Sequence, residues 1–354
     1  KLGQKGGWTS YVHHELLPRL YGFELMMAPY TIAHLKISLK LQETGFLYFN
    51  ETRSGKARLN VYLTNSLEDA PKQQELLAFD FGAAIAKEAE EASIIKNKKP
   101  IMIVLGNPPY SAVSSNETPY ANKLVEKYKV EPGGKLKLQE RKHWLNDDYV
   151  KFLALAEDMI AKNGEGVVAM VTNNGYLDNP TFRGMRWHWA TTFDKIYVLN
   201  LHGNVKKKEM ALDGGKDENV FDIQQGVGIA IAVKTGNKKQ GELAEVYHAE
   251  LFGKRSSKFE ALEKEPLWKQ VELTGKMLYF VPKSTEGQDE YEKGIKLDEL
   301  FSENVTGIVT MGDDFIISDT KEIIAERVQK LAHGDYDEQT LNHEFGLGKN
   351  YAKW

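Results

Sequence analysis

Four consecutive residues in the first half of the sequence, Asn107-Pro108-Pro109-Tyr110, are suited to activating a planar amino group such as that of adenine. The Asn107 side-chain oxygen and the Pro108 carbonyl can both accept hydrogen bonds from such a nitrogen. Two acceptors draw the nitrogen toward tetrahedral geometry and free its lone pair for attack. The prolines fix φ and lack an N–H, so they hold the carbonyl rigidly without a competing donor.

The ring of Tyr110 completes this candidate site, because its face can stack on a base that has left a duplex. The tetrapeptide directly follows the apolar run Ile101–Leu105. Ligands bind at the carboxyl ends of strands in parallel α/β sheets, so this position favours a binding role. The alternative interpretation is a rigid turn between a strand and a loop.

Short apolar runs alternate with helical patterns, which predicts an α/β fold with a mostly parallel twisted sheet flanked by helices. The consecutive apolar residues of the run before the tetrapeptide are typical of a parallel strand buried on both faces, although a buried helix segment could have the same pattern. The expected strands are Tyr21–Leu25, Leu59–Leu63, Ile101–Leu105, Gly166–Val171, Lys195–Asn200 and Val227–Lys234. The expected helices are Tyr30–Leu41, Phe81–Ile95 and Asp147–Ala161, the last with Asn146 as its N-cap.

The character of the sequence changes beyond about Lys254, where Lys and Glu become frequent and the alternation of strands and helices becomes irregular. A length of 354 residues suggests two domains. We expect a larger domain over residues 1–250 and a smaller, irregular C-terminal segment over residues 251–354. One helix is expected in that segment, at Lys321–Leu331.

The composition excludes several classes of protein. With no cysteine, the chain has no disulfide, thiolate zinc site or iron–sulfur cluster. The histidines lack the spacing of helical metal ligands, so we expect no metal site. No Walker-type phosphate loop occurs, so we do not expect a helicase motor in this sequence. No apolar stretch is long enough to cross a membrane, and no signal peptide is visible. The formal charge of −4 gives no global basic field, so DNA contacts would need local basic patches.

The tetrapeptide resembles motif IV of the amino-methyltransferases, and neighbouring segments extend the resemblance. Gly22-Phe23-Glu24-Leu25 resembles motif II, which implies that Glu24 binds the ribose hydroxyls of S-adenosylmethionine; a solvated charge is the alternative. Residues 62–67 (YLTNSL) resemble motif III, which implies cofactor contacts by Asn65 and Leu67. The family usually has an acid where Asn65 stands, but an amide oxygen can accept the same hydrogen bond. A turn after a strand is the alternative there.

Three further matches follow in the order of the family. Residues 148–152 (DYVKF) resemble motif V, which implies that Phe152 packs on the cofactor. Residues 166–177 resemble the motif VI strand and its loop. Residues 219–227 (NVFDIQQGV) resemble motif VIII, which implies that Phe221 stacks on the flipped base. For both phenylalanines, packing in the protein core is the alternative.

This motif order is that of the gamma class of N6-adenine DNA methyltransferases, and the longer strings resemble the methyltransferase region of single-chain Type ISP restriction–modification enzymes. The resemblance covers about residues 8–234 and, more weakly, 306–317. It implies a Rossmann-like domain that transfers a methyl group from S-adenosylmethionine to adenine N6 in double-stranded DNA by base flipping. It also implies the bacterial cytoplasm, nuclease and helicase parts in the same polypeptide, and the start of a target-recognition region in residues 251–354.

One motif of the family has no counterpart here. Motif I is a Gly-rich loop after the first strand, and Gly3, Gly6 and Gly7 follow no strand. We therefore expect the chain to be a fragment that starts inside the cofactor domain and is inactive by itself.

Basic residues near the expected site are candidates for contacts with DNA phosphates. Three of them, Lys206, Lys207 and Lys208, lie in a loop after the strand Lys195–Asn200. The alternative is that this loop is simply solvated. Arg183 and Arg186 are expected in the loop after motif VI. Lys96–Lys99 precedes the central strand at its amino end and is expected to be a solvated helix terminus.

Two other functions remain open from the sequence. A protein glutamine methyltransferase shares the Asn-Pro-Pro-Tyr motif because its acceptor is also a planar, amide-like nitrogen. The long region after motif VIII argues against it, because DNA methyltransferases of this class place target recognition there. A non-catalytic DNA-binding module is the second alternative, since motif I is not found.

Overall fold

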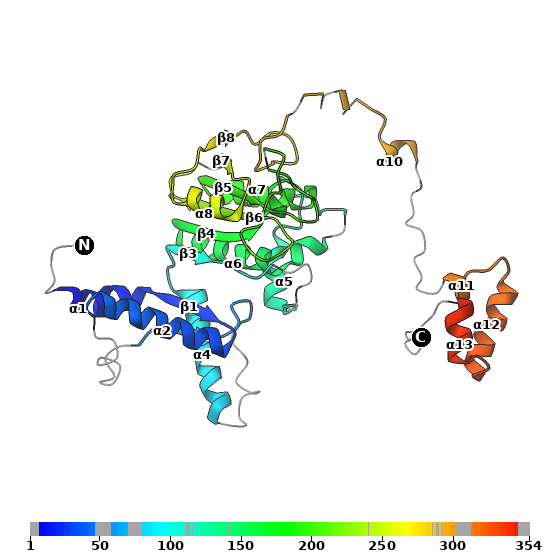
Figure 1. The fold of residues 1–354 in the computed structure, drawn as a ribbon, viewed down its shortest axis with the longest axis horizontal. Helices are drawn as coiled ribbons and strands as arrows, with labels where there is room; N and C mark the ends of the chain where they lie inside the picture. Colours follow the sequence, from blue (N-terminus) through cyan, green and yellow to red (C-terminus); the bar gives the residue numbers. More distant parts are fainter. Residues whose placement is uncertain are drawn as a thin grey trace. The chain divides into compact units, whose positions relative to one another are not determined.

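The computed structural model describes residues 7–46, 58–69, 80–110, 114, 116–140, 142–211, 213–239, 241–284, 286–287, 290–291, 293–301, 303 and 313–345. The chain divides into two compact units, Lys1–Lys283 and Ser284–Trp354 (Figure 1). All of the candidate site residues lie in the first unit.

A six-stranded sheet with the order β3-β4-β6-β5-β7-β8 forms the centre of the first unit. Strands β3, β4, β5 and β7 run in one direction, while β6 and β8 are antiparallel to their neighbours. The predicted α/β fold is therefore confirmed, with a mixed sheet. The strands are β3 (Ile103–Gly106), β4 (Gly166–Asn173), β5 (Lys195–His202), β6 (Val227–Lys234), β7 (Glu245–Glu250) and β8 (Lys269–Val271).

Helices pack on both faces of this sheet. Val198 belongs to a large core cluster with Leu153 and Trp189, whereas its neighbour Leu199 belongs to a second cluster that includes Leu262. Adjacent residues of a strand point to opposite faces, so the two clusters cover the two sides of the sheet. The helices involved are α5 (Pro119–Glu126), α6 (Asp148–Asn163) and α7 (Arg183–Thr192) on the first side and α8 (Arg255–Leu262) on the second.

A separate parallel pair, β1 (Tyr21–Glu24) and β2 (Asn60–Leu63), precedes the larger sheet. Helix α2 (Met27–Glu43) connects the two strands, and α4 (Asp80–Lys98) follows β2 and packs on it (Figure 1). Short helical turns complete this unit: α1 (Trp8–Tyr11), η2 (Val12–Leu16), η3 (Leu17–Arg19), η5 (His143–Asn146), η6 (Asn174–Leu177) and η7 (Pro180–Phe182).

Strand β3 lies at one edge of the six-stranded sheet as the structure describes it. Two of its apolar side chains, Ile103 and Leu105, are 62% and 73% exposed. This differs from the expectation of a strand buried on both faces: Val104 packs against the large core cluster on one face, whereas Ile103 and Leu105 point to the other face and stay exposed.

In the second unit, three helices enclose a small aromatic core of Phe315, Tyr336 and Phe345. The predicted helix at Lys321–Leu331 is confirmed as α12 (Lys321–His333), which Thr320 caps at its start and Gly334, with φ of 76°, at its end. The other helices are α10 (Leu297–Leu300), α11 (Asp313–Ile316) and α13 (Glu338–Phe345).

The helix expected at Asp147–Ala161 is found at Asp148–Asn163, with Asp147 rather than Asn146 at the N-cap position. Asn146 instead ends the short turn η5. The first compact unit extends beyond residue 250, because β8 pairs with β7. The functional division that we expect near residue 250 stays a prediction.

Candidate functional site

The Asn107–Tyr110 tetrapeptide directly follows the carboxyl end of β3, as predicted. Asn107 is exposed, Pro108 is buried, and Tyr110 is half-buried against the large core cluster. Burial raises the pKa of the Tyr110 hydroxyl, so the ring stays neutral at ordinary pH. The amide of Asn107 is thus open to a ligand, while the ring beside it is anchored in the core.

Glu24 and Asn65 follow neighbouring parallel strands and are brought together by the backbone. Glu24 ends β1, and its carbonyl accepts a hydrogen bond of 2.8 Å from the Thr64 N–H. The Glu24 carboxylate accepts a bond of 3.1 Å from the Met26 N–H through Oε1. A carboxylate has more lone pairs than this bond uses, so Glu24 can still accept hydroxyl donors. The ribose role predicted for Glu24 fits this position.

The Asn65 side chain is held within the protein. Its Oδ1 accepts a bond of 3.0 Å from the Leu67 N–H, and its Nδ2 donates to Asn116 Oδ1 at 2.9 Å. An amide oxygen has two lone pairs, so Oδ1 can accept a further bond from a cofactor amino group.

Leu67 does not suit the cofactor contact that we expected. Its side chain is fully buried in the large core cluster. Its N–H bonds to Asn65, and its carbonyl accepts a bond of 3.0 Å from Thr118 Oγ1. Both backbone groups and the side chain are therefore engaged inside the protein.

Phe152 and Phe221 are both half-buried and pack against core side chains, but in different places. Phe152 lies on α6 and contacts the large cluster, as Tyr110 does. Phe221 contacts the second cluster, and its N–H bonds to Asn219 Oδ1 at 2.9 Å. The cofactor role of Phe152 and the base-stacking role of Phe221 stay predictions.

Arg183 and Arg186 lie on helix α7, so the prediction of a loop was wrong. The Arg183 guanidinium forms ion pairs with Glu131 and Glu140. Arg186 is fully buried and donates hydrogen bonds to three backbone carbonyls, those of Tyr176, Asn179 and Met277. Burial lowers the pKa of Arg186 to about 10. Guanidinium groups engaged in this way do not reach DNA phosphates, so we no longer assign either arginine to the DNA.

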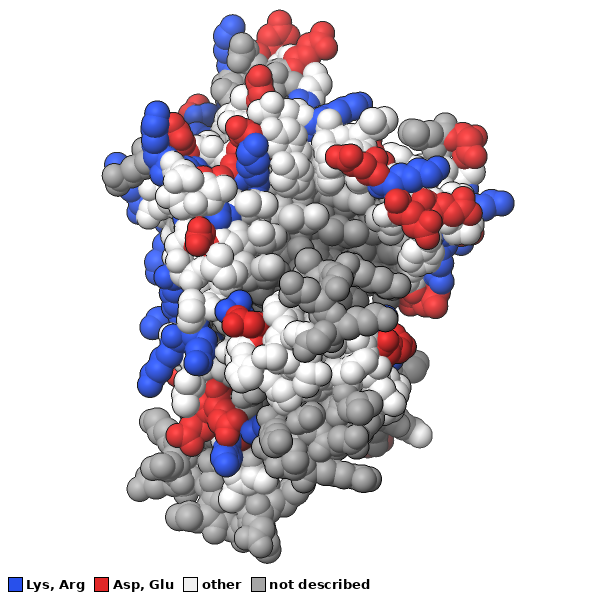
Figure 2. All heavy atoms as spheres, turned by 90° about the vertical axis from the view of Figure 1, so that its left-hand side faces the viewer, with Lys and Arg blue, Asp and Glu red and all other residues white. Residues whose placement is uncertain are grey.

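Lys206, Lys207 and Lys208 are exposed in a turn after β5, where sequence analysis placed them. Acidic and basic side chains both occur across the face of the molecule shown in Figure 2. Contact with phosphates would therefore be local, which is what the net charge predicts.

The long connection between β5 and β6, which carries these lysines and Phe221, is anchored by a buried ion pair. Lys258 of α8 and Asp217 have fully buried side chains, with Nζ 2.9 Å from Oδ2. Asp217 also accepts bonds of 2.7 Å from the N–H groups of Gly203 and Gly253. This pair fixes the loop to the sheet on one side and to the segment before α8 on the other.

A polar cavity of about 320 Å³ lies at the carboxyl ends of β5 and β7. His248 is 4% exposed there, and its Nε2 has no hydrogen-bond partner among the described residues. Burial lowers the pKa of His248, so its ring is neutral at neutral pH. The lining residues include Asn174, Asn200, His202, Lys207, Glu209, His248, Glu250 and Lys283.

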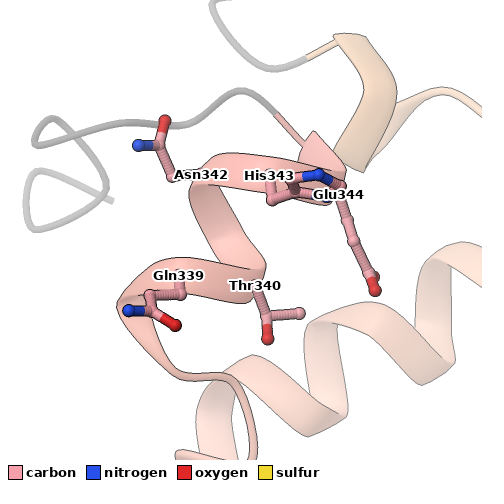
Figure 3. Close-up of a pocket in the computed structure, with 5 residues that line it drawn as sticks. All are labelled: Gln339, Thr340, Asn342, His343 and Glu344. Atoms are coloured by element: carbon pink, nitrogen blue, oxygen red, sulfur yellow. The ribbon is translucent and has the colours of Figure 1, made fainter.

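A second hollow, of about 740 Å³, lies along α13 in the second unit. Figure 3 shows its five polar side chains on successive turns of that one helix. They do not converge on a point, so this hollow offers no catalytic arrangement. In the part of the chain that the structure describes, no cluster of His, Asp or Glu could hold a metal ion. No helix there is long and apolar enough to cross a membrane.

Two lysines close to the loop of Asn65 are buried, which the sequence did not predict. Lys96 is 3% exposed, which contradicts its assignment to a solvated helix terminus, and Lys151 is fully buried. Lys96 was missed because a lysine before a strand is usually solvated. The apolar residues of α4 at Ala92 and Ile95 place it next to buried positions, and this was the available signal.

A family model described as Eco57I restriction-modification methylase matches residues 19–202. This range is just over half of the chain, and it contains Glu24, Asn65 and the tetrapeptide. No curated protein matches the sequence.

Several solved structures share the fold. The cryo-EM structure of a DrdV–DNA complex matches with 22% identity and a TM-score of 0.61, over 93% of this chain and 33% of that chain. The ATP-dependent Type ISP restriction-modification enzyme LlaBIII bound to DNA matches with 21% identity and a TM-score of 0.61, over 94% of this chain and 22% of that one. A nuclease-deletion mutant of the Type ISP enzyme LlaGI, in complex with a DNA substrate mimic, matches with 19% identity and a TM-score of 0.61, over 97% and 27% of the two chains. The chain thus spans a third or less of the length of these proteins.

Proposed function

The chain belongs to the Eco57I restriction-modification methylase family, and on this basis we propose that it carries the centre that methylates adenine N6 in double-stranded DNA. The observation that carries the proposal is the position of the tetrapeptide. Asn107 is exposed at the carboxyl end of β3, next to a proline carbonyl held by the prolines and a tyrosine ring anchored in the core. The DNA in the matched complexes supports the choice of substrate.

The methyl donor in this proposal is S-adenosylmethionine, which supplies an electrophilic methyl group when bound. The carboxylate of Glu24 and the amide of Asn65 lie on adjacent loops, 24–26 and 64–67, at the carboxyl ends of β1 and β2. A carboxylate can accept two ribose hydroxyls, and an amide oxygen can accept the amino group of the adenine moiety. The residues present therefore fit this donor.

The chain's own residues then act on the substrate base. Asn107 Oδ1 and the Pro108 carbonyl accept the two N6 hydrogens, which localises the lone pair on nitrogen. With the donor bound, N6 would form a bond to the methyl carbon as the carbon–sulfur bond breaks, and N6 would then release one proton to solvent. Tyr110 stacks on the base. Phe221 packs against the cluster on the other side of the sheet, and its contact with the base is a separate proposal. Because N6 is paired within a duplex, the adenine must leave the stack to reach this site.

The proposal also covers where the enzyme acts and which other parts its polypeptide contains. The enzyme acts in the bacterial cytoplasm, and nuclease and helicase parts act in the same polypeptide. Target recognition begins after residue 250. The likeness of the fold to LlaBIII and LlaGI, which are Type ISP enzymes, supports this view.

The test is methylation of duplex DNA by the intact protein and by its Asn107→Ala variant. Wild type should transfer labelled methyl groups, and digestion of the product should yield N6-methyladenine. Asn107→Ala should lower the rate by about 100-fold or more, because the missing hydrogen bond acts in the transition state, and it should leave DNA affinity within about twofold. Asn237→Ala, at an exposed position after β6, is the matched control and should keep the wild-type rate.

Two results would contradict the proposal. A near wild-type rate for Asn107→Ala would remove the tetrapeptide from the chemistry. Methylation of a glutamine-containing peptide, with none of the duplex, would instead assign the chain to protein glutamine methylation.

A further inference from the structure

Two lysines with buried side chains bond either to Asn65 or to its hydrogen-bond partner Asn116. Lys96 lies in the last turns of α4 and is 3% exposed, and Lys151 lies near the start of α6 and is fully buried. Removing an ammonium group from water is costly unless its donors are bonded. The groups that these two lysines bond to therefore show what they hold in place.

Lys96 holds the loop that follows β2. Its Nζ lies 3.4 Å from the Asn65 carbonyl oxygen and also donates to the carbonyl of Glu68. The rings of Phe23 and Tyr120 lie nearby, with their centroids 6.0 Å and 5.7 Å from Nζ. Burial lowers the pKa of Lys96, which the carboxylates of Asp69 and Glu68 and the negative faces of the two rings oppose.

Lys151 holds Ser114 and Asn116, which lie beyond the Asn107–Tyr110 tetrapeptide. Its Nζ donates to the Asn116 carbonyl at 2.5 Å and to Ser114 Oγ at 2.7 Å. Asp148, one turn earlier on α6, accepts bonds from Ser114 Oγ at 2.5 Å and from Asn116 Nδ2 at 3.0 Å. Burial lowers the pKa of Lys151, which the nearby carboxylate of Asp148 opposes.

The two sets of bonds meet at Asn65. Asn116 Oδ1 accepts the bond from Asn65 Nδ2, so a chain of side chains runs from the loop after β2 to helix α6. A second link joins Thr118 Oγ1 to the Leu67 carbonyl. The members of this network are partly buried, and each bond that breaks leaves a polar group without its partner, so the network holds the loop in one arrangement.

We infer that Lys96 and Lys151 are positioning residues that fix the loop carrying Asn65 for the adenine moiety of S-adenosylmethionine. This inference rests on the proposed function, since it takes the cofactor from there. Neither lysine touches the acceptor base, so their removal acts on cofactor binding and leaves the methyl-transfer step itself nearly unchanged.

The experiment compares Lys96→Met and Lys151→Met with matched controls in the intact protein. Methionine keeps the unbranched side chain and removes the ammonium group. Lys98→Met on α4 and Lys162→Met on α6 remove exposed lysines from the same helices. Calorimetry with S-adenosylmethionine gives the dissociation constant, and steady-state methylation of duplex DNA gives KM for the cofactor and kcat.

We expect Lys96→Met and Lys151→Met each to raise the cofactor dissociation constant and KM about tenfold or more, because partly buried carbonyls lose their donor. The value of kcat at saturating cofactor should stay within about twofold, and both controls should match wild type. In hydrogen exchange, the amides of Leu67 and Asn116 should exchange faster in the variants, whereas those of β5 and β6 should keep their protection. A general loss of structure would instead expose all of these amides.

Asn116→Ala covers the case in which a lysine variant does not fold. It breaks the link between Asn65 and Asp148 without leaving a charge, and it should produce the same rise in KM. The inference is overturned if Asn116→Ala or the folded lysine variants bind the cofactor as tightly as wild type, or if the controls weaken binding equally. The proposed function, by contrast, fails if wild type itself neither binds S-adenosylmethionine nor methylates DNA. Hydrogen exchange at Leu67 and Asn116 still tests the hydrogen-bonded network in that event.

Discussion

Replacing Lys258 by methionine should remove much of the stability of the first unit. Its ammonium group donates to Asp217 Oδ2 at 2.9 Å and to the carbonyls of Leu201 and Glu218 at 2.8 Å and 2.6 Å. The side chains of both ion-pair partners are fully buried. The substitution would therefore leave a carboxylate and two carbonyls without this donor in a site closed to water.

The magnitude follows from the asymmetry of buried ion pairs. Removing one partner of such a pair costs about 3–5 kcal/mol, because the remaining charge is uncompensated. Asp217 keeps its bonds from the N–H groups of Gly203 and Gly253, which limit the destabilisation. A cost of about 4 kcal/mol is roughly a thousandfold change in the unfolding equilibrium. It is a large part of the roughly 5–15 kcal/mol that stabilises a typical domain.

Urea unfolding followed by circular dichroism measures this change as a lower midpoint with an unchanged slope. Asp222→Asn is the control, because Asp222 is 92% exposed and its pairing with Arg255 should contribute at most about 1 kcal/mol. Adding Asp217→Asn to Lys258→Met should recover part of the stability, since it removes the buried charge. A Lys258→Met variant within about 1 kcal/mol of wild type would refute the reasoning.

Three further predictions concern the site and its surroundings. With 2-aminopurine at the target position, the fluorescence of the probe should be brighter in the Tyr110→Ala complex than in the wild-type complex, because a stacked ring quenches a flipped base. Unchanged fluorescence in both Tyr110→Ala and Phe221→Ala would show that neither ring contacts the base. Although burial opposes ionisation of Glu157, Lys127 and His188 lower its pKa to about 2, below its ordinary value of 4.5. The stability that Glu157 contributes should thus be present above pH 4.5 and be lost as the pH falls toward 2. In Glu157→Gln, the free energy of unfolding should depend less on pH over this acidic range. An unchanged pH dependence would show that the Glu157 carboxylate does not contribute in this way. Replacing the three exposed lysines after β5, Lys206, Lys207 and Lys208, by glutamine should reduce the salt dependence of DNA binding. The slope of log K against log salt concentration should become smaller by about 0.9 for each phosphate that a lysine no longer neutralises. An unchanged slope would mean that these lysines are solvated and do not contact DNA.

The position of the catalytic candidate could be predicted from sequence because its local signals agree. Five apolar residues end before Gly106, and the two prolines that follow cannot continue a strand interior. The end of α6 was similarly clear, since Gly164 takes up φ of 90° where the helix stops. These features depend on backbone chemistry within a few residues, so a single sequence carries them.

The roles of Arg183 and Arg186 could not be predicted in the same way. Basic residues beside tryptophan have the composition of a nucleic-acid surface, but Arg186 bonds to the Met277 carbonyl, 91 residues along the chain. Gly184 between them was a local indication, because a Cβ there would collide with the carbonyls of Tyr128 and Val130. Such close approach means that this turn of α7 faces the protein.

Strand β7 and the burial of Lys96 were missed for a related reason. The strand sequence EVYHAE is half polar, and its pairing with β5 and β8 rather than its own pattern makes it a strand. Lys96 is buried because the carbonyls of Asn65 and Glu68 turn toward it. In both cases the bonding partner decides the outcome, and that partner is distant in sequence.

The edge that β3 forms in the described part of the sheet has a practical consequence for anyone who handles residues 1–354. A strand edge with exposed apolar side chains is a template on which other polypeptides add by backbone pairing. Ile103 and Leu105 are such side chains, so this edge favours self-association. Self-association through this edge would grow with protein concentration and would mimic a specific oligomer in gel filtration. Ile103→Lys puts a charge on this edge and leaves Asn107 unchanged. The variant should therefore self-associate less, and methyl transfer at Asn107 can still be measured in it.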